Sequence, residues 1–272
     1  MALKADFHLH SSFSGDSDAP MEEIIKKAIS LGLTHICFTE HYDPDFVYPA
    51  GESGTFELNT DSYLYDLLRF REKYYGQIQI MFGVELGLQP HLRDALEFYT
   101  ENHDFDFIIG SSHICNRKDP YYPEFFEGRS EDEAHQEYFE SILECVKETP
   151  YFDVYGHLDY VVRYGKSREK EYSYTDYADI IDEILKLLIE KEKGLEVNSA
   201  GLKYGLPFAH PHPDVLKRYR ELGGEIITIG ADAHKPEHIA YDFAKAEEIL
   251  KSCGFKYYTE FFEQKPVFKQ LI

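Results

Sequence analysis

Residues 3–41, LKADFHLHSSFSGDSDAPMEEIIKKAISLGLTHICFTEH, hold two short apolar segments on either side of an amphipathic one. The apolar segments at 3–9 and 34–40 have strand character, and the segment near 20–31 repeats its apolar residues with helical spacing. Each apolar segment ends in or beside histidine. This stretch therefore predicts a strand, a helix and a second strand, with polar side chains where the strands end.

The same alternation continues to the end of the chain without a linker rich in proline, glycine or serine. The strand candidates are 3–9, 34–40, 78–86, 106–112, 152–158, 194–199 and 225–231, and the helix candidates lie near 20–31, 61–75, 91–101, 131–148, 176–193, 212–222 and 240–252. Seven βα units with parallel strands follow, arranged as an open doubly wound sheet or as a closed barrel. We expect one domain over residues 1–272, with a terminal strand and an extended segment after Gly254.

The placement of polar residues favours the barrel. Nearly every strand candidate carries a histidine, aspartate or glutamate at or just beyond its carboxyl end. In a barrel these ends meet at one mouth, where the active sites of such folds are built, whereas an open sheet spreads them along an edge. The expected fold class is therefore α/β, with a TIM-like barrel of seven βα units.

Composition and charge exclude several classes of protein. The 272 residues include 28 basic and 50 acidic side chains, which gives a net charge of −22. A chain with this much negative charge repels nucleic-acid phosphates and anionic membranes. Neither is therefore an expected partner. With no leader-like segment, no long apolar run and four scattered cysteines, a cytoplasmic location with reduced thiols is expected. Monomers and dimers are both compatible with the sequence.

Nine potential metal ligands lie at these strand ends or, in the case of Asp16, on the loop after the first strand. His8 and His10 are two residues apart, so an extended strand presents both imidazoles on one face. The full set is His8, His10, Asp16, His41, Glu85, His113, His157, Asp232 and His234. All nine offer nitrogen or oxygen, and no thiolate is among them. One ion cannot use nine donors, but three ions with about three ligands each and a bridging carboxylate can.

Several segments resemble one protein family. DFHLHSSFSGD, FTEH, GVELG, GSSH, YGHLDYVVRYG, EVNSAGL and GADAH, in this order, are similar to motifs of the polymerase and histidinol phosphatase (PHP) superfamily, histidinol-phosphatase branch. The resemblance implies a distorted (β/α)7 TIM-like barrel of PHP type that holds three divalent ions, with zinc, manganese and iron all compatible. It places one metal at His8, His10, Glu85 and Asp232, a second at Glu85, His113 and His157, and a third at Asp16, His41 and His234.

Basic residues near the predicted mouth are candidates for binding phosphate. Arg163 and Lys203 lie on predicted mouth loops and match basic positions of the family, and Arg117 follows His113. An arginine fork suits phosphate and a lysine acts as a point charge, although Arg117 is equally compatible with a solvated surface position.

Two long loops after the second and fourth strands, 42–60 and 115–130, are expected to cover the substrate. They could enclose a small aromatic cation. The acids of the first loop, Asp43, Asp45, Glu52 and Glu57, either pair with its amine or remain solvated.

The resemblance implies a metal-dependent phosphomonoesterase that converts L-histidinol phosphate to L-histidinol and phosphate in histidine biosynthesis. A metal-bridging hydroxide would attack phosphorus in line, and Asp232 and His234 are the expected catalytic residues for proton transfer. The alternatives are the same centre acting on a nucleotide, a sugar phosphate or phosphotyrosine, a non-catalytic metal-binding scaffold, and a metal-dependent amide hydrolase on a related barrel. No position of the ligand set is missing, and no lysine is marked as a modified metal ligand.

Overall fold

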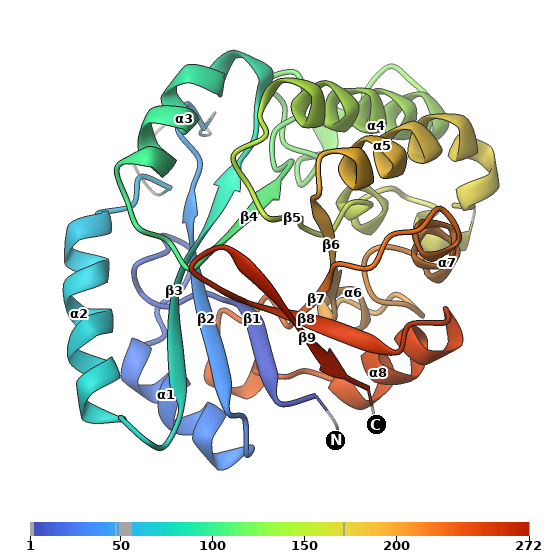
Figure 1. Ribbon diagram of the computed structural model, residues 1–272. Helices are drawn as coiled ribbons and strands as arrows, with labels where there is room; N and C mark the ends of the chain where they lie inside the picture. The colour runs from blue at the N-terminus through green and yellow to red at the C-terminus, as the bar shows by residue number, and fades with distance from the viewer. Residues whose placement is uncertain (1–2, 47, 49–55, 171, 272) are drawn as a thin grey trace.

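Seven parallel strands form the centre of the computed structural model, which describes residues 3–46, 48, 56–170 and 172–271 (Figure 1). They are β1 (Ala5–Leu9), β2 (His35–Tyr42), β3 (Gln79–Gly87), β4 (Phe107–Ser111), β5 (Val154–Tyr155), β6 (Gly194–Asn198) and β7 (Ile227–Gly230). Each strand pairs in parallel with the next one along the chain. All seven overlap the predicted segments.

Helices surround the strands on the outside (Figure 1). They are α1 (Met21–Ser30), α2 (Thr60–Lys73), α3 (Arg93–Glu101), α4 (Glu131–Glu148), α5 (Ala178–Glu190), α6 (Ala200–Lys203), α7 (Pro213–Glu221) and α8 (Phe243–Ser252). The longest, α4, begins at a capping box formed by Ser130 and Glu133, which satisfies free amide groups of its first turn. The sequence did not predict α6, because four residues are too few to show an amphipathic repeat.

The first and last strands of the sheet meet and nearly close the barrel. Leu9 and Ala233 form a parallel bridge, and the amide of His10 donates to the carbonyl of Ala233 at 3.0 Å. The buried carboxylate of Asp6 accepts from the amides of Ala231 at 3.0 Å and Ala240 at 2.9 Å. These contacts confirm the predicted barrel, because an open doubly wound sheet would keep its edge strands apart.

A carboxyl-terminal hairpin covers the end of the barrel where the strands begin. It consists of β8 (Tyr257–Phe262) and β9 (Lys265–Gln270), and Figure 1 shows it crossing the centre of the strands. Thr259 accepts from the amide of Ile227 at 3.2 Å, and the rings of Phe261 and Phe107 lie 5.0 Å apart. The expected extended segment after Gly254 is thus a second strand, since the edge position of Pro266 tolerates a missing amide.

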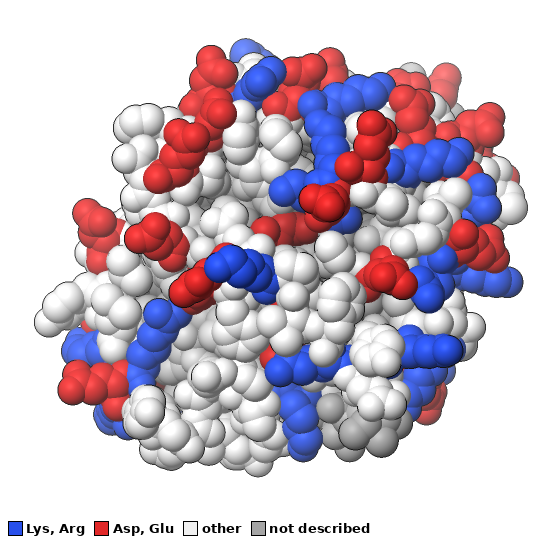
Figure 2. Space-filling model, in the orientation of Figure 1, with Lys and Arg blue, Asp and Glu red and all other residues white. Residues whose placement is uncertain are grey.

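On the face that carries the hairpin, charged side chains are not gathered by sign. Figure 2 shows acidic and basic side chains interspersed on the face that carries the hairpin. Within the described part of the chain, none of the helices combines the length and apolar character that a membrane span requires. Because the hairpin blocks one end of the barrel, the polar residues that follow the strands face the opposite end.

Candidate metal centre

The nine sequence-predicted ligands converge at the carboxyl ends of the strands. β1, β2 and β3 contribute His8, His41 and Glu85, and the residues just beyond β1, β4, β5 and β7 contribute the others. Several ring atoms and carboxylate oxygens in this set approach to within 4.8 Å of one another in groups of three. The structure therefore assembles the residue set that the spacing of strand ends predicts.

Glu85 lies at the centre of the cluster and is fully buried. One of its oxygens lies 3.1 Å from His8 Nε2 and 3.4 Å from His10 Nε2. Its other oxygen lies 3.2 Å from His113 Nε2 and 2.9 Å from His157 Nε2. A carboxylate that faces two separate pairs of imidazoles has the geometry of a ligand bridging two cations.

Asp232 completes the first of these groups. Its Oδ1 lies 3.5 Å from His10 Nε2 and 3.8 Å from His8 Nε2. The residue adopts a left-handed backbone conformation with φ of 50°, which is unfavourable for an aspartate and typical of functional positions. The grouping of His8, His10, Glu85 and Asp232 matches the first metal site that the family resemblance implies.

A third group lies closer to solvent. Asp16 Oδ2 lies 3.0 Å from His234 Nε2 and 3.6 Å from His41 Nε2. The second ring nitrogen of His41 lies 3.1 Å from Glu85, so this group adjoins the buried ones. Asp16, His41 and His234 are the residues that the resemblance assigns to the third ion.

The unsatisfied atoms of the cluster fit divalent cations. Buried atoms without a hydrogen bond among the described residues include His8 Nε2, His10 Nε2, His41 Nδ1, Glu85 Oε2 and His234 Nε2. Native proteins leave few buried polar atoms unpaired, so a concentration of them at one point requires an explanation. Imidazole nitrogens and carboxylate oxygens that point at one another without hydrogen bonding are the donor set of zinc, manganese or iron.

The electrostatics of the cluster also favour bound positive charge. Burial opposes ionisation of Glu85, but the surrounding His8, His113 and His41 hold its pKa well below the usual value. Burial likewise opposes charge on His8, yet Glu196 and Glu85 raise its pKa well above normal. The buried carboxylates of the cluster therefore favour positive charge beside them, which metal cations would supply.

Glu196 in β6 is an additional site residue, which was not among the predicted ligands although it belongs to the EVNSAGL segment. It is buried, its Oε1 lies 2.5 Å from His8 Nδ1, and its Oε2 accepts from the amide of His157 at 3.0 Å. It thereby fixes the ring of His8 with Nε2 directed at Glu85. A carboxylate inside an otherwise apolar strand was the available signal, since such a group is costly unless it is paired.

A second positioning network surrounds His10. Glu40 accepts from the hydroxyl of Ser14 at 2.6 Å, and the Ser14 oxygen lies 3.0 Å from His10 Nδ1. Asp43 plays a similar role on the other side, with Oδ1 at 2.8 Å from His113 Nδ1. These contacts orient the rings so that their other nitrogens face the cluster.

Close approach of two strands explains the glycine of the GADAH segment. A Cβ atom at Gly230 would overlap with the side chains of His8 and Glu196. Any larger residue would therefore displace β7 from β1 or disturb the pair that orients His8. The glycine is required by packing beside the site.

A cavity of about 680 Å³ opens above the cluster. Arg163 lines it from the loop after β5, and its side chain is 9% exposed. The guanidinium carbon lies 4.3 Å from the ring centre of Tyr204 and 5.0 Å from that of Tyr160. Its Nε and Nη2 atoms are buried and make no hydrogen bond with described residues. An arginine held between rings with free donors is suited to an anionic ligand.

The other two predicted basic residues differ in placement. Lys203 lines the cavity, and its ammonium donates to the carbonyl of Asp232 at 3.0 Å. Burial lowers the pKa of this lysine. Arg117 is exposed and is not part of the cavity lining. The structure therefore brings Arg163 and Lys203 to the cavity above the cluster and leaves Arg117 outside it, on a turn where residues 116 and 117 have positive φ angles.

The acidic residues predicted on the first long loop differ in burial. Asp43 is buried against His113, whereas Asp45 and Glu57 are exposed. Glu52 lies outside the described residues. None of the described three is an unpaired acid within the cavity.

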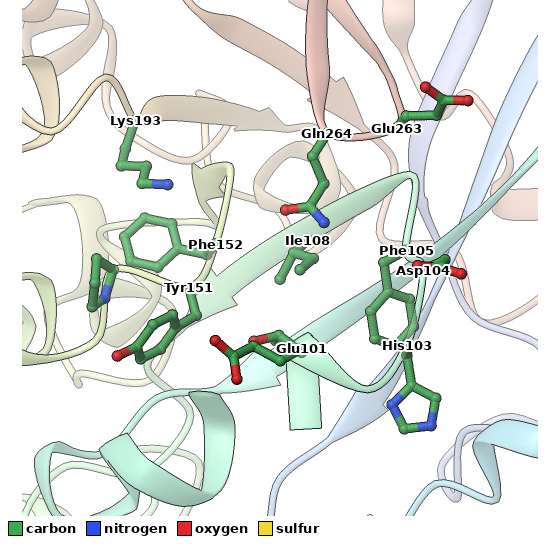
Figure 3. A pocket seen from close by; sticks show the side chains of 12 residues that line it. Glu101, His103, Asp104, Phe105, Ile108, Tyr151, Phe152, Lys193, Glu263 and Gln264 are labelled. Atoms are coloured by element: carbon green, nitrogen blue, oxygen red, sulfur yellow. The ribbon is translucent and has the colours of Figure 1, made fainter. Parts of the chain in front are cut away.

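A second cavity, of about 720 Å³, lies at the other end of the barrel between the strand beginnings and the hairpin turn. Figure 3 shows Lys193, Phe152 and Gln264 around it. None of the grouped metal-binding residues lines this cavity. The grouped metal-binding residues therefore lie at the mouth cavity.

Comparisons with known proteins agree with this arrangement. A model of the PHP domain family matches residues 6–200. Histidinol-phosphatase of Lactococcus lactis subsp. lactis (strain IL1403) is 33% identical over 254 residues, covering 93% of this chain and 92% of that protein.

Two crystal structures share the fold. Histidinol phosphate phosphatase from the same Lactococcus strain, in complex with zinc, L-histidinol and phosphate, superposes with a TM-score of 0.88 at 32% identity, covering 97% of this chain and 98% of that one. A Listeria monocytogenes protein reaches a TM-score of 0.74 at 20% identity, covering 89% of this chain and 99% of that one, and supports the fold alone. The chain is a member of the PHP domain family.

Proposed function

We propose that this protein is a metal-dependent phosphomonoesterase that hydrolyses L-histidinol phosphate to L-histidinol and phosphate in histidine biosynthesis. The observation that carries the proposal is the buried cluster around Glu85, which lies beside a buried arginine with free donors. The Lactococcus enzyme, which shares about a third of its sequence with this chain, binds zinc, L-histidinol and phosphate. A non-catalytic scaffold would not need a free guanidinium next to a complete ligand set.

Three divalent ions are proposed to occupy the three groups, with ligands His8, His10, Glu85 and Asp232, then Glu85, His113 and His157, then Asp16, His41 and His234. When bound, such ions neutralise phosphate charge and activate water. Arg163 is proposed to bind the phosphate oxygens through its fork, and Lys203 to add a second positive charge. His234, supported by Asp232, is proposed to hold the proton that the departing alkoxide oxygen needs.

The reaction is proposed to take place in the cytoplasm. All four cysteines are free and buried, namely Cys37, Cys115, Cys145 and Cys253. A protein that keeps four unpaired thiols suits a reducing compartment.

The proposed function is tested by phosphate release from L-histidinol phosphate, p-nitrophenyl phosphate, AMP and a phosphotyrosine peptide, with the metal content measured on the same sample. We expect about three ions per chain and a clear preference for L-histidinol phosphate. Three ions with preference for another ester would retain the chemistry and reject the substrate. Absence of both metal and activity would favour the scaffold.

Glu196→Gln is expected to lower the affinity for one metal ion about 10- to 100-fold. The reason is that a neutral amide holds the Nδ1 side of the His8 ring less strongly than the Glu196 carboxylate does. Competition with a chelator of known affinity measures the change. Glu225→Gln, at a surface position near Arg220, is the matched control and should leave metal affinity unchanged. Wild-type affinity in Glu196→Gln would show that Glu196 does not position His8 for binding.

A further inference from the structure

We propose that Asp119 binds the ammonium group of the substrate and thereby selects phosphoesters of amino alcohols over amine-free esters. This inference rests on the proposed function, since it assigns a specificity residue to the same site. Asp119 lines the mouth cavity and belongs to the long loop after β4, 115–130, which is expected from the sequence to cover the substrate.

The argument begins with the carboxylates that line the mouth cavity. The described ones are Asp16, Asp43, Glu85, Asp119 and Asp232. Four of them face histidine nitrogens at 2.8–3.8 Å and belong to the cluster or orient its rings. Asp119 is the exception within the described part of the chain, with no basic side chain in ion-pair contact. It is therefore the acid available to a cationic ligand.

The hydrogen bonding of Asp119 leaves one oxygen for that ligand. Oδ1 accepts from the amide of Tyr121 at 2.7 Å, and Oδ2 has no hydrogen-bond partner among the described residues. The loop is anchored just before Asp119, where Cys115 and Lys118 exchange backbone hydrogen bonds of 2.8 and 3.0 Å. A carboxylate fixed by its own backbone is oriented before substrate binds, which reduces the entropy cost of binding.

The partial burial of Asp119 strengthens the case that its carboxylate binds a cation. Removal from water raises the pKa of Asp119 to about 6, and the hydrogen bond from Tyr121 only partly opposes this. A half-buried carboxylate without a cation gains more from a bound ammonium than an exposed one does, because the local dielectric is lower. Salt bridges at the surface lack this gain.

Aromatic rings on the same wall suit an ammonium as well. The ring of Tyr121 lies 5.5 Å from that of Tyr164, and Tyr160 lies 5.0 Å from the ring of His157. Asp119 lines the same cavity as Tyr121, Tyr160 and Tyr164. Ring faces attract cations, so the tyrosines add to the charge of Asp119. The wall adjoins His157, so a bound ester would reach the cluster and Asp119 together.

The substrate group that Asp119 binds in this proposal is the amine rather than the imidazole. An aliphatic ammonium keeps its charge throughout the neutral range, whereas an imidazole with a pKa near 6.5 is mostly neutral above pH 7. A fixed carboxylate discriminates most strongly in favour of the permanently charged group.

The test compares three substrates: L-histidinol phosphate, its deamino analogue 3-(imidazol-4-yl)propyl phosphate, and 2-aminopropyl phosphate, which lacks the imidazole. In the wild type we expect kcat/KM for L-histidinol phosphate to exceed that for the deamino analogue about 10- to 100-fold. Asp119→Asn should abolish most of this preference, raising KM for both amines and leaving the deamino analogue within about twofold.

Asp45→Asn is the matched control, because Asp45 pairs with His91 at 2.9 Å on the surface and lies outside the cavity lining. Its kinetics should equal those of the wild type. Metal content and thermal unfolding verify that Asp119→Asn is folded, and the wild-type preference tests the inference even without that variant.

An equal loss on all three substrates, a loss that follows the imidazole, or a wild type without preference for the amine would overturn the assignment. Failure of the proposed function looks different, since the wild type would then hydrolyse another ester better than L-histidinol phosphate.

Discussion

Replacing Glu85 with glutamine is expected to remove most of the bound metal and to lower kcat by about a thousandfold or more. The two carboxylate oxygens face separate imidazole pairs, at 3.1 and 3.4 Å on one side and 3.2 and 2.9 Å on the other. An amide keeps one acceptor and places an NH2 group against the other pair. Because breaking a buried charged group costs roughly 3–5 kcal/mol, the loss should reach that order.

Metal analysis and phosphate release on the same preparation measure this effect. Glu101→Gln is the matched control, since Glu101 is exposed and lines the cavity at the opposite end of the barrel. It should retain full metal content and full turnover. If Glu85→Gln also retained both, Glu85 would not bridge two ions, and the centre would have to be rebuilt around Asp232 and Asp16.

The barrel, and the convergence of the nine candidate ligands at its mouth, could be predicted because both depend on regular repeats. Strands such as β2 and β3 are long apolar segments, and a parallel strand must place its carboxyl end beside that of its neighbour, as His41 lies opposite Glu85. Even β5, which has only two paired residues, could be identified as a strand of the series because His157 follows it. Position along the chain was therefore sufficient to predict that the candidate residues lie together.

The residues that orient the ligands were harder to predict. Glu40 neighbours His41 in β2, yet it reaches the cluster through Ser14, a residue of the loop after β1. Such a contact depends on how the loop after β1 folds back, which no periodic pattern encodes.

The orientation of side chains on the loop after β4 was equally hard to predict. Arg117 and Asp119 are two positions apart, and only Asp119 lines the cavity. The positive φ angles at the turn separate them, and a sequence of mixed polar residues does not specify which side chain turns inward.

Substitution of Arg163 by methionine is expected to lower kcat/KM for L-histidinol phosphate about 100-fold. The guanidinium is nearly fully buried, contacts three tyrosine rings and has two nitrogen donors without partners among the described residues. Charged hydrogen bonds contribute about 1.5–3 kcal/mol each, so the loss of a single such contact to phosphate accounts for this change. Arg117→Met is the matched control and should have wild-type kinetics, because Arg117 is exposed.

Thermal unfolding separates a substrate-binding role of Arg163 from a structural one. A buried charge with unpaired donors destabilises the free protein, so a methionine of similar length should leave the free energy of unfolding unchanged or raise it. A structural arginine would instead lose stability and activity together. Phosphate should also protect the metal-loaded wild type against unfolding more than it protects Arg163→Met, since binding to the folded state alone raises stability. Equal protection of both proteins would remove Arg163 from the phosphate site, and Lys203 and Lys235 would then be the lysines of the cavity wall to test.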